Sequence, residues 1–249
     1  MEDREPSRRN ARLLVSSYRA IRRAIGYTGF ALPVALGPGG WLLLDIPIQD
    51  NLSSYYHTPL RDVFVGTICA IGIFLYCYRG YDRVENWTAN LACLSALGIA
   101  LCPLDPGSDP LRQRTVVGYP HSISGGVFFL TLAFYSLYHF PRSSDEESPV
   151  TEDPPVYAAV GRQPQRDLIY RVSGIVILLA MIGMGVYLLF LPDDAKRWAD
   201  QYNVLFWGEW IAVWAFASAW LTKGRTILSE IAVSVLGLAT DQFRDQDQH

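Results

Sequence analysis

The sequence lacks charge over long parts of its length. Only 18% of its 249 residues are charged, and Asp, Glu, Lys and Arg are absent from five stretches of 16 or more residues. A sixth stretch holds one charged residue, Glu209. Because the charges are segregated into the intervening loops and tails, the pattern excludes a soluble globular protein. The six charge-poor stretches are residues 24–44, 63–78, 86–104, 115–141, 172–192 and 201–222.

The sequence also lacks the short motifs of several enzyme classes. It has no Walker phosphate-binding loop, no His-Glu-x-x-His zinc motif and no Gly-x-Ser-x-Gly nucleophile elbow. No lysine lies in the charge-poor stretches, which argues against a retinal Schiff base. The four cysteines lie in these stretches and include no Cys-x-x-Cys pair, so neither a thiolate zinc site nor a loop disulfide is expected.

The charge-poor stretches predict six transmembrane helices. A spanning helix needs about 20 mostly apolar residues, each adding about 1.5 Å. The stretch 63–78 is shorter and must include its neighbours, which places Arg61 and Asp62 at the membrane edge. We therefore predict an all-α, multi-pass membrane protein in which residues 24–222 form a membrane domain of six helices.

The basic residues predict the orientation of this domain. Sixteen of the 21 Lys and Arg residues fall on the side that holds both termini. The positive-inside rule places that side in the cytoplasm, and an even number of spans independently requires both termini to share a side. We expect the protein in a bacterial inner membrane or an equivalent plasma membrane.

Three segments have a different composition from the spans. Residues 1–23 hold seven arginines and predict a cytoplasmic basic amphipathic helix at the anionic membrane surface. Residues 142–165 are rich in Ser, Pro, Asp and Glu and predict a disordered linker. Residues 223–249 predict a cytoplasmic tail with a short surface helix, because its apolar part is too short to span.

Small residues and a glycine-proline run mark positions of close packing. The run at 37–40, together with Pro33, predicts a kink in the first span, either for packing or as a flexible pocket wall. Small residues four apart favour close helix contact, within the chain or between copies in a homo-oligomer. Membrane lipids are the other expected partners. Binding to nucleic acid is not expected. The small-residue stripes are Ala92, Ala96 and Ala100, and Gly208, Ala212, Ala215 and Ala219.

Ionisable side chains gather at one end of the predicted bundle. The spans 63–78, 115–141 and 201–222 would all begin at the outer face, and Thr58 with Pro59 would start the first of them. Glu209 lies about six residues inside its span, roughly 9 Å from its end. An ionisable group in a span costs about 2.5–3.5 kcal/mol and usually faces a partner or a water-filled cavity, so we expect a shared polar pocket there.

The residue types at this end favour metal chemistry. The positive ends of three helices would keep carboxylates ionised and imidazoles neutral. Neutral imidazole and carboxylate are ligands for zinc or another divalent metal, and a metal-bound water could act as a hydrolytic nucleophile on a lipid or amphiphile. The candidates are His57, His121 and Glu209 as metal ligands, Asp62, Glu209 and Ser53 as catalytic groups, and Arg61 for an anionic head group.

Other interpretations of these residues stay open. Arg61 could pair with Asp62 or Glu209, while the histidines form ordinary hydrogen bonds at the interface. Glu209 could take up and release a proton in a small carrier, or the chain could be a structural or assembly subunit. His139 cannot join the group, because it follows His121 by 18 helical residues, about 27 Å.

Two resemblances rest on the segment around the second span. Ser53-x-x-x-His57, the run 61–66 and Tyr78-Arg79-Gly80-Tyr81 resemble a bacterial family of six-span membrane proteins of unknown function, over most of the chain. Ser53, His57 and Asp62 are also similar, more weakly, to elements of the alkaline ceramidase and progestin/adipoQ-receptor superfamily of membrane metal hydrolases. That resemblance implies zinc-dependent amide hydrolysis. The chain differs from the superfamily in having six predicted spans rather than seven and no His-x-x-x-His motif.

Overall fold

Among the residues that it describes, the computed structural model contains helices and no strand. The described residues are 4–78, 80, 82–107, 110–111, 113–142, 163–226 and 231–236. Most of the predicted linker 142–165, and most of the tail beyond residue 226, lie outside them. The elements are α1 (Arg4–Val34), η1 (Ala35–Gly39), α2 (Gly40–Leu44), η2 (Leu52–His57), α3 (Arg61–Cys77), α4 (Arg83–Leu101), α5 (Gly118–Phe134), η3 (Tyr135–His139), α8 (Gln163–Phe190), α9 (Asp193–Asp200) and α10 (Val204–Lys223).

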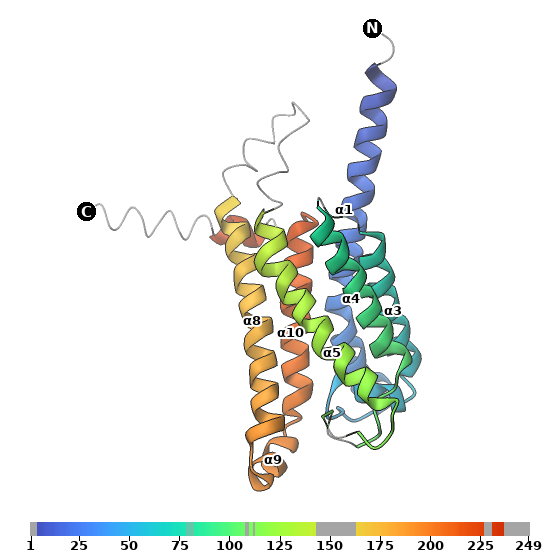
Figure 1. Ribbon diagram of the computed structural model, residues 1–249, viewed down its shortest axis with the longest axis vertical. Helices are drawn as coiled ribbons and strands as arrows, with labels where there is room; N and C mark the ends of the chain where they lie inside the picture. Colours follow the sequence, from blue (N-terminus) through green and yellow to red (C-terminus); the bar gives the residue numbers. More distant parts are fainter. Residues whose placement is uncertain are drawn as a thin grey trace, which may run out of the picture.

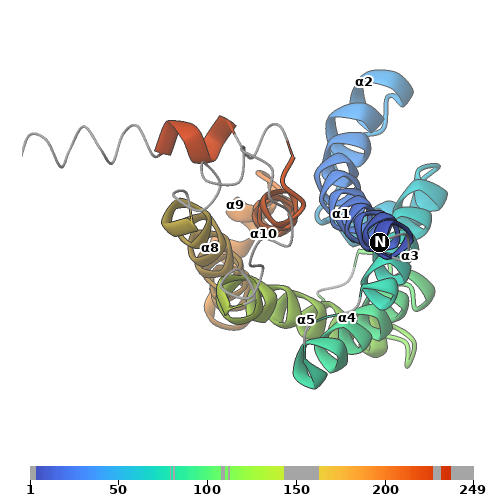
Figure 2. The ribbon, with the colours of Figure 1, turned by 90° about the horizontal axis from the view of Figure 1, so that it is seen from above.

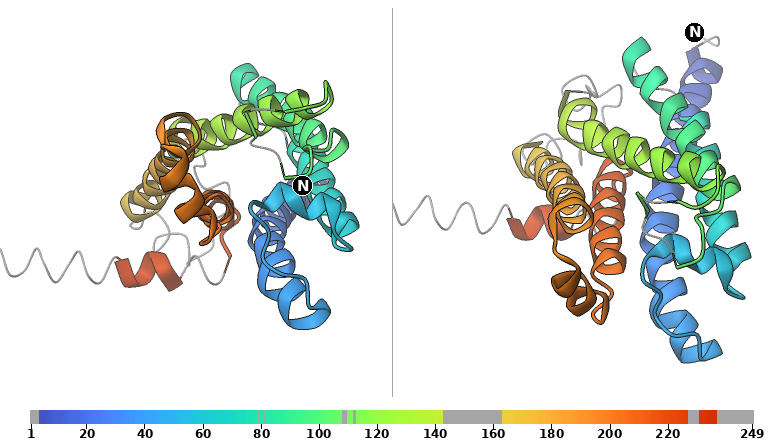
Figure 3. Two further views of the ribbon diagram at one scale, coloured as in Figure 1. Left: turned by 90° about the horizontal axis from the view of Figure 1, so that it is seen from below. Right: turned by 60° about the horizontal axis from the view of Figure 1, so that its bottom comes forward.

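Six long helices form a closed ring. Contacts run from α1 to α3, α4, α5, α8 and α10 in turn, and α10 packs back against α1. The views from above and below show this ring, with α5 running obliquely across it (Figures 2 and 3). We call the end that holds residues 45–60, 113–117 and 191–203 the loop end. The opposite end, where α1 begins and α10 finishes, is the terminal end (Figure 1).

Four of these helices are long and apolar enough to cross a membrane, which identifies a helical, membrane-embedded protein. They match the first, fourth, fifth and sixth predicted spans. The helix α3 has 17 residues and is too short to join this set, and α4 has 19 residues but is not apolar enough over its length. The four candidate spans are Ser17–Leu44, Gly118–Arg142, Pro164–Phe190 and Val204–Lys223.

The outward face of α8 is a continuous apolar stripe. Its members follow one another at spacings of three and four residues, so they share one side of the helix. An exposed apolar surface of this length is typical of a face that contacts lipid. The stripe consists of Ile175, Leu179, Ile182, Val186 and Leu189, all at least 44% exposed.

The first helix continues through the glycine-proline run instead of breaking there. Residues 35–39 form a π-helix between α1 and α2. A Cβ added at Gly37 would lie 2.7 Å from Cζ of Phe206 in α10, and one at Gly40 would lie 2.6 Å from Cδ1 of Leu60. The irregularity therefore allows close packing, which favours the packing interpretation of the run over the flexible-wall interpretation.

The helix α10 begins where the sequence predicts, whereas α3 begins later than predicted. Glu209 is the sixth residue of α10, as predicted. The helix α3 begins at Arg61, two residues later than Pro59. The reason is a turn in which the Thr58 hydroxyl donates to the carbonyl of Tyr55 (2.8 Å) and accepts from the N–H of Leu60 (3.2 Å). Asp62 nevertheless lies in the first turn of α3.

The small-residue stripes pack inside the chain. Ala92, Ala96 and Ala100 are at most 1% exposed, and a Cβ added at Gly72 of α3 would lie 3.1 Å from that of Ala96. On α10, a Cβ added at Gly208 would approach Met184 of α8 within 2.9 Å. These contacts join neighbouring helices of one chain, and homo-oligomer formation stays a prediction.

The direction of α5 creates the space for a site. Near the terminal end, η3, which directly continues α5, lies against α8, because a Cβ added at Gly174 would overlap the side chain of Leu137. Near the loop end α5 lies against α4, because a Cβ added at Gly98 would overlap Ser124. The helix therefore crosses the bundle diagonally and diverges from α8 toward the loop end (Figure 1).

Candidate functional site

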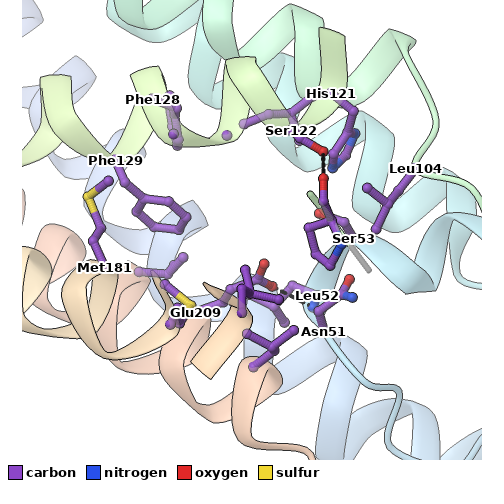
Figure 4. Close-up of a pocket in the computed structure, with 18 of the residues that line it drawn as sticks. Asn51, Leu52, Ser53, Leu104, His121, Ser122, Phe128, Phe129, Met181 and Glu209 are labelled. Carbon is purple, nitrogen blue, oxygen red and sulfur yellow. Dashed lines mark hydrogen bonds between the residues drawn. The ribbon is translucent and has the colours of Figure 1, made fainter. Parts of the chain in front are cut away.

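A cavity of about 280 Å³ lies in the loop half of the ring. Its walls come from α1, α3, α4, α5, α8 and α10, together with the segments before η2 and before α5. Most of the lining is apolar or aromatic, as in typical ligand pockets. Examples are Phe64, Ile68, Phe128, Phe129, Met181 and Val213 (Figure 4).

Polar groups line the cavity at one side. They come from three places in the sequence: the segment at the start of η2, the first turns of α5 and the second turn of α10. Three of the predicted site residues, Ser53, His121 and Glu209, are therefore brought to one cavity. The polar lining residues are Asn51, Ser53, His121, Ser122 and Glu209 (Figure 4).

Glu209 connects α10 to the segment that precedes α3. Its Oε2 accepts a hydrogen bond of 2.6 Å from the backbone N–H of Leu52, the first residue of η2. A neighbouring bond from the N–H of Phe206 to the carbonyl of Asp50 (2.9 Å) joins the same two segments. Within the described residues, no cation forms an ion pair with the Glu209 carboxylate. The carboxylate is partly buried and borders the cavity.

His121 has a fixed tautomer. Its side chain is 4% exposed, and Nδ1 lies 2.7 Å from the carbonyl oxygen of Cys102. Because a carbonyl only accepts, Nδ1 carries the proton and donates it, which leaves Nε2 as an acceptor when the imidazole is neutral. In the cavity that it shares with Glu209, His121 thus offers an acceptor and not a second donor.

The segment before α5 is held by Asp105, which the sequence interpretation overlooked. The Asp105 carboxylate accepts hydrogen bonds from the N–H of Arg114 (2.5 Å), the N–H of Thr115 (2.7 Å) and the Thr115 hydroxyl (2.7 Å). These bonds, from Thr115 above all, lower the pKa of Asp105 below its usual value. The Gln113 side chain accepts from the N–H of Asp105 (2.9 Å). Together they fix the start of α5 and hence His121.

Ser122 is also engaged by this segment, since its hydroxyl donates to the carbonyl of Pro110 (Figure 4).

Three other predicted site residues do not line the cavity. The Nε2 of His57 donates to the carbonyl of Leu104 (2.6 Å), and its ring packs edge-on against Tyr56 at 5.3 Å. The Arg61 guanidinium lies 4.9 Å from the centre of the Tyr56 ring, and the side chains of Arg61 and Asp62 are exposed. The structure therefore separates His57, Arg61 and Asp62 from Ser53, His121 and Glu209.

The predicted metal ligands accordingly do not converge. Among the residues that the structure describes, no group of three His, Cys, Asp or Glu side chains is placed to hold a metal ion. His121 and Glu209 share the cavity, but His57 is directed to Leu104. Two protein ligands are fewer than the three or four typical of zinc sites.

A second polar cluster lies near the terminal end and was missed from the sequence. Glu85 is 2% exposed; it accepts from the Tyr78 hydroxyl (2.8 Å) at its carboxylate and from the Tyr135 hydroxyl (2.9 Å) at its backbone carbonyl. Nearby, Nε2 of His139 lies 3.3 Å from the Thr88 hydroxyl. This cluster joins the end of α3, the start of α4 and the π-helix η3.

The sequence contained a signal for Glu85. Asp82 caps α4 by accepting from the N–H of Glu85 (2.7 Å), so Asp82-x-x-Glu85 has the spacing of a capping box. That pattern marks a helix start at Arg83, three residues before the charge-poor stretch 86–104 begins. The charge-poor stretch alone predicts that Glu85 lies in the loop before the helix.

No family model, no curated protein and no solved structure matches this chain. The resemblances stated from the motifs therefore stay predictions, and function is argued from the cavity.

Proposed function

We propose that this chain is a six-span membrane protein, with both termini cytoplasmic, that binds a lipid or another amphiphile in the cavity beside Glu209. The observation that carries the proposal is an apolar cavity of about 280 Å³ whose polar groups all belong to one set, around Glu209 and His121. An amphiphile has the same division into an apolar and a polar part. The volume is near the lower end of the range of about 300–1,000 Å³ for ligand pockets.

The position of the cavity supports a ligand that comes from the membrane. With the terminal end in the cytoplasm, as the basic residues predict, the loop end and the cavity lie in the outer half of the bilayer. Leu111 and Leu189 belong to the lining and are 44% and 66% exposed, so the cavity reaches the protein surface. Leu189 also belongs to the apolar stripe of α8, which would face lipid.

Glycines on both sides keep this part of the cavity open. Gly125 and Gly126 of α5 and Gly185 of α8 line it, and no atom lies within 4 Å of a Cβ added at any of them. Larger side chains would project into the space between the diverging helices. An acyl chain can therefore enter between the loop halves of α5 and α8.

Hydrolysis and proton coupling are further steps that this binding site would permit. His121 and Glu209 supply two ligands for zinc or another divalent metal, so a metal-dependent hydrolase needs a third ligand from the substrate or water. The absence of an ion pair to Glu209 in the described residues favours the carrier as second candidate, because an unpaired carboxylate in a span is suited to exchange a proton. A purely structural subunit would need neither a metal ligand nor proton exchange at Glu209.

The proposal is tested by filling the cavity. Gly185→Leu and Gly126→Leu place a side chain in the cavity, whereas Gly183→Leu and Gly66→Leu place one in open space outside its lining. All four changes replace a helical glycine, so each raises helix propensity similarly. The measurement is mass spectrometry of amphiphiles that co-purify with the full chain.

We expect the two cavity variants to lose the bound amphiphile and the two control variants to retain it. Equal occupancy in all four variants, or no co-purifying amphiphile in the wild type, would contradict amphiphile binding. For the carrier, proton-dependent uptake that is lost in Glu209→Gln would be the supporting result.

A further inference from the structure

We infer that the head group of the bound amphiphile donates hydrogen bonds and carries no negative charge, as an amine or a hydroxyl group does. This inference rests on the proposed function, because it names the ligand class of the same cavity. It follows from the charges and the unused hydrogen-bonding positions around Glu209.

The described lining of the cavity is acidic. Glu209 is the charged side chain in it, and no Lys or Arg belongs to it. An anionic head group placed beside Glu209 would meet a like charge in surroundings from which water is partly excluded, where such repulsion is strong. A donor group would instead form a charge-assisted hydrogen bond.

Three of the described basic residues at the loop end are engaged elsewhere, and the fourth, Arg114, does not line the cavity. Arg61 stacks on Tyr56 outside the cavity. Lys196 donates to the carbonyl of Leu188 (2.7 Å), and Arg197 pairs with Asp194 within α9. None of the three belongs to the lining. The expectation that Arg61 holds an anionic head group therefore has no support from its position.

Glu209 and His121 offer open acceptor positions in the cavity. A carboxylate has about four lone-pair sites, and Leu52 uses one of those on Glu209. Nε2 of His121 is an acceptor, since Nδ1 donates to Cys102. The Ser122 hydroxyl is already donating to Pro110.

The remaining donors of the polar lining are the Asn51 amide and the Ser53 hydroxyl. The Oδ1 of Asn51 accepts from the N–H (2.8 Å) and the hydroxyl (3.0 Å) of Ser54, which orients its amide nitrogen as the free group. A hydroxyl head group could accept from this nitrogen while donating to Glu209. An amine would donate to Glu209.

The test compares amphiphiles that share one chain and differ in head group. Dodecylamine, dodecan-1-ol, dodecanoate and dodecyl phosphate are titrated onto the full chain in lipid nanodiscs, with binding followed by ligand-observed NMR. Empty nanodiscs and the Gly185→Leu variant give the partitioning that does not involve the cavity. The difference between wild type and Gly185→Leu is the cavity-dependent affinity.

We expect the amine and the alcohol to bind at least about tenfold more tightly than the two anions, since one hydrogen bond to a charged group corresponds to a factor of this size. In Glu209→Gln, which keeps an acceptor for Leu52, we expect this preference to fall below about threefold. Cavity-dependent binding of the anions equal to or tighter than that of the amine and alcohol would overturn the head-group inference and leave amphiphile binding intact. No cavity-dependent binding of any probe would overturn both.

Discussion

The Oε2 atom of Glu209 accepts a hydrogen bond of 2.6 Å from the backbone N–H of Leu52. This single contact joins residues 157 positions apart and fixes the segment that carries Asn51 and Ser53 against α10. It also means that Glu209 has a structural role in addition to any role toward a ligand. The two roles can be separated by the choice of substitution.

We expect Glu209→Ala to destabilise the protein by about 1–3 kcal/mol, because the partly buried N–H of Leu52 would lose its acceptor. Glu209→Gln retains an acceptor oxygen and should cost less than Glu209→Ala. Thermal unfolding of both variants in the same detergent is the measurement. If Glu209→Ala were as stable as the wild type, the Leu52 bond would not matter for the fold.

The buried cluster at the terminal end gives a prediction about stability alone. Tyr78→Phe removes the hydroxyl that donates to the Glu85 carboxylate, and we expect a loss of about 1.5–3 kcal/mol, the range for a hydrogen bond to a charged group. Tyr138→Phe is the matched control, because its hydroxyl accepts from Arg142 at the surface. Its expected effect lies within about 0.5 kcal/mol. Similar melting temperatures for both variants would argue against the importance of the cluster.

The pKa of Asp105 predicts a pH dependence of stability. Hydrogen bonds from Thr115 and Arg114 lower the pKa of Asp105 below its usual value of 3.8. The unfolded chain therefore binds this proton more readily than the folded chain, and stability rises with pH. The contribution is present above about pH 3.8 and is lost as the pH falls through the lower folded pKa.

We accordingly expect Asp105→Asn to melt below the wild type at neutral pH, with the difference shrinking as the pH is lowered toward 3. Melting curves between pH 7 and pH 3 are the measurement, with Asp193→Asn in α9 as the exposed control. A difference that is constant over this range would show that ionisation of Asp105 is not the cause.

Arg61 offers a direct comparison between the sequence interpretation and the structure. It is exposed and stacks on Tyr56, so we expect Arg61→Ala to change cavity-dependent amphiphile binding by less than about twofold. His121→Ala, which alters the lining, should weaken binding by about tenfold. The two variants are compared in the nanodisc titration. Weaker binding in Arg61→Ala would show that Arg61 contributes to amphiphile binding.

Metal content tests the hydrolase hypothesis separately. Because two of the three predicted ligands reach the cavity, we expect less than one zinc ion per chain in purified protein by elemental analysis. Stoichiometric zinc that is lost in both His57→Ala and His121→Ala would instead support the metal site that the sequence predicted.

The charge-poor stretches determine much of the fold because apolar length, which is a local property, decides where a membrane helix forms. They correctly locate α5, α8 and α10 and place Glu209 in the second turn of α10. They do not set the start of α3, which depends on the Thr58 turn, or reveal Glu85, which lies just outside its stretch. The start of α3 and the position of Glu85 depend on individual hydrogen bonds.

By itself, the sequence determined a helical membrane protein with ionisable groups gathered at one end of three helices. Only the tertiary structure decided which of these groups share a cavity, because that depends on how each helix is rotated and on the path of the connecting segments. The bond between Leu52 and Glu209 holds Ser53 and Glu209 at the cavity, and the contacts of Asp105 with the start of α5 do the same for His121. The contacts of His57 with Leu104 and of Arg61 with Tyr56 turn the remaining candidates away.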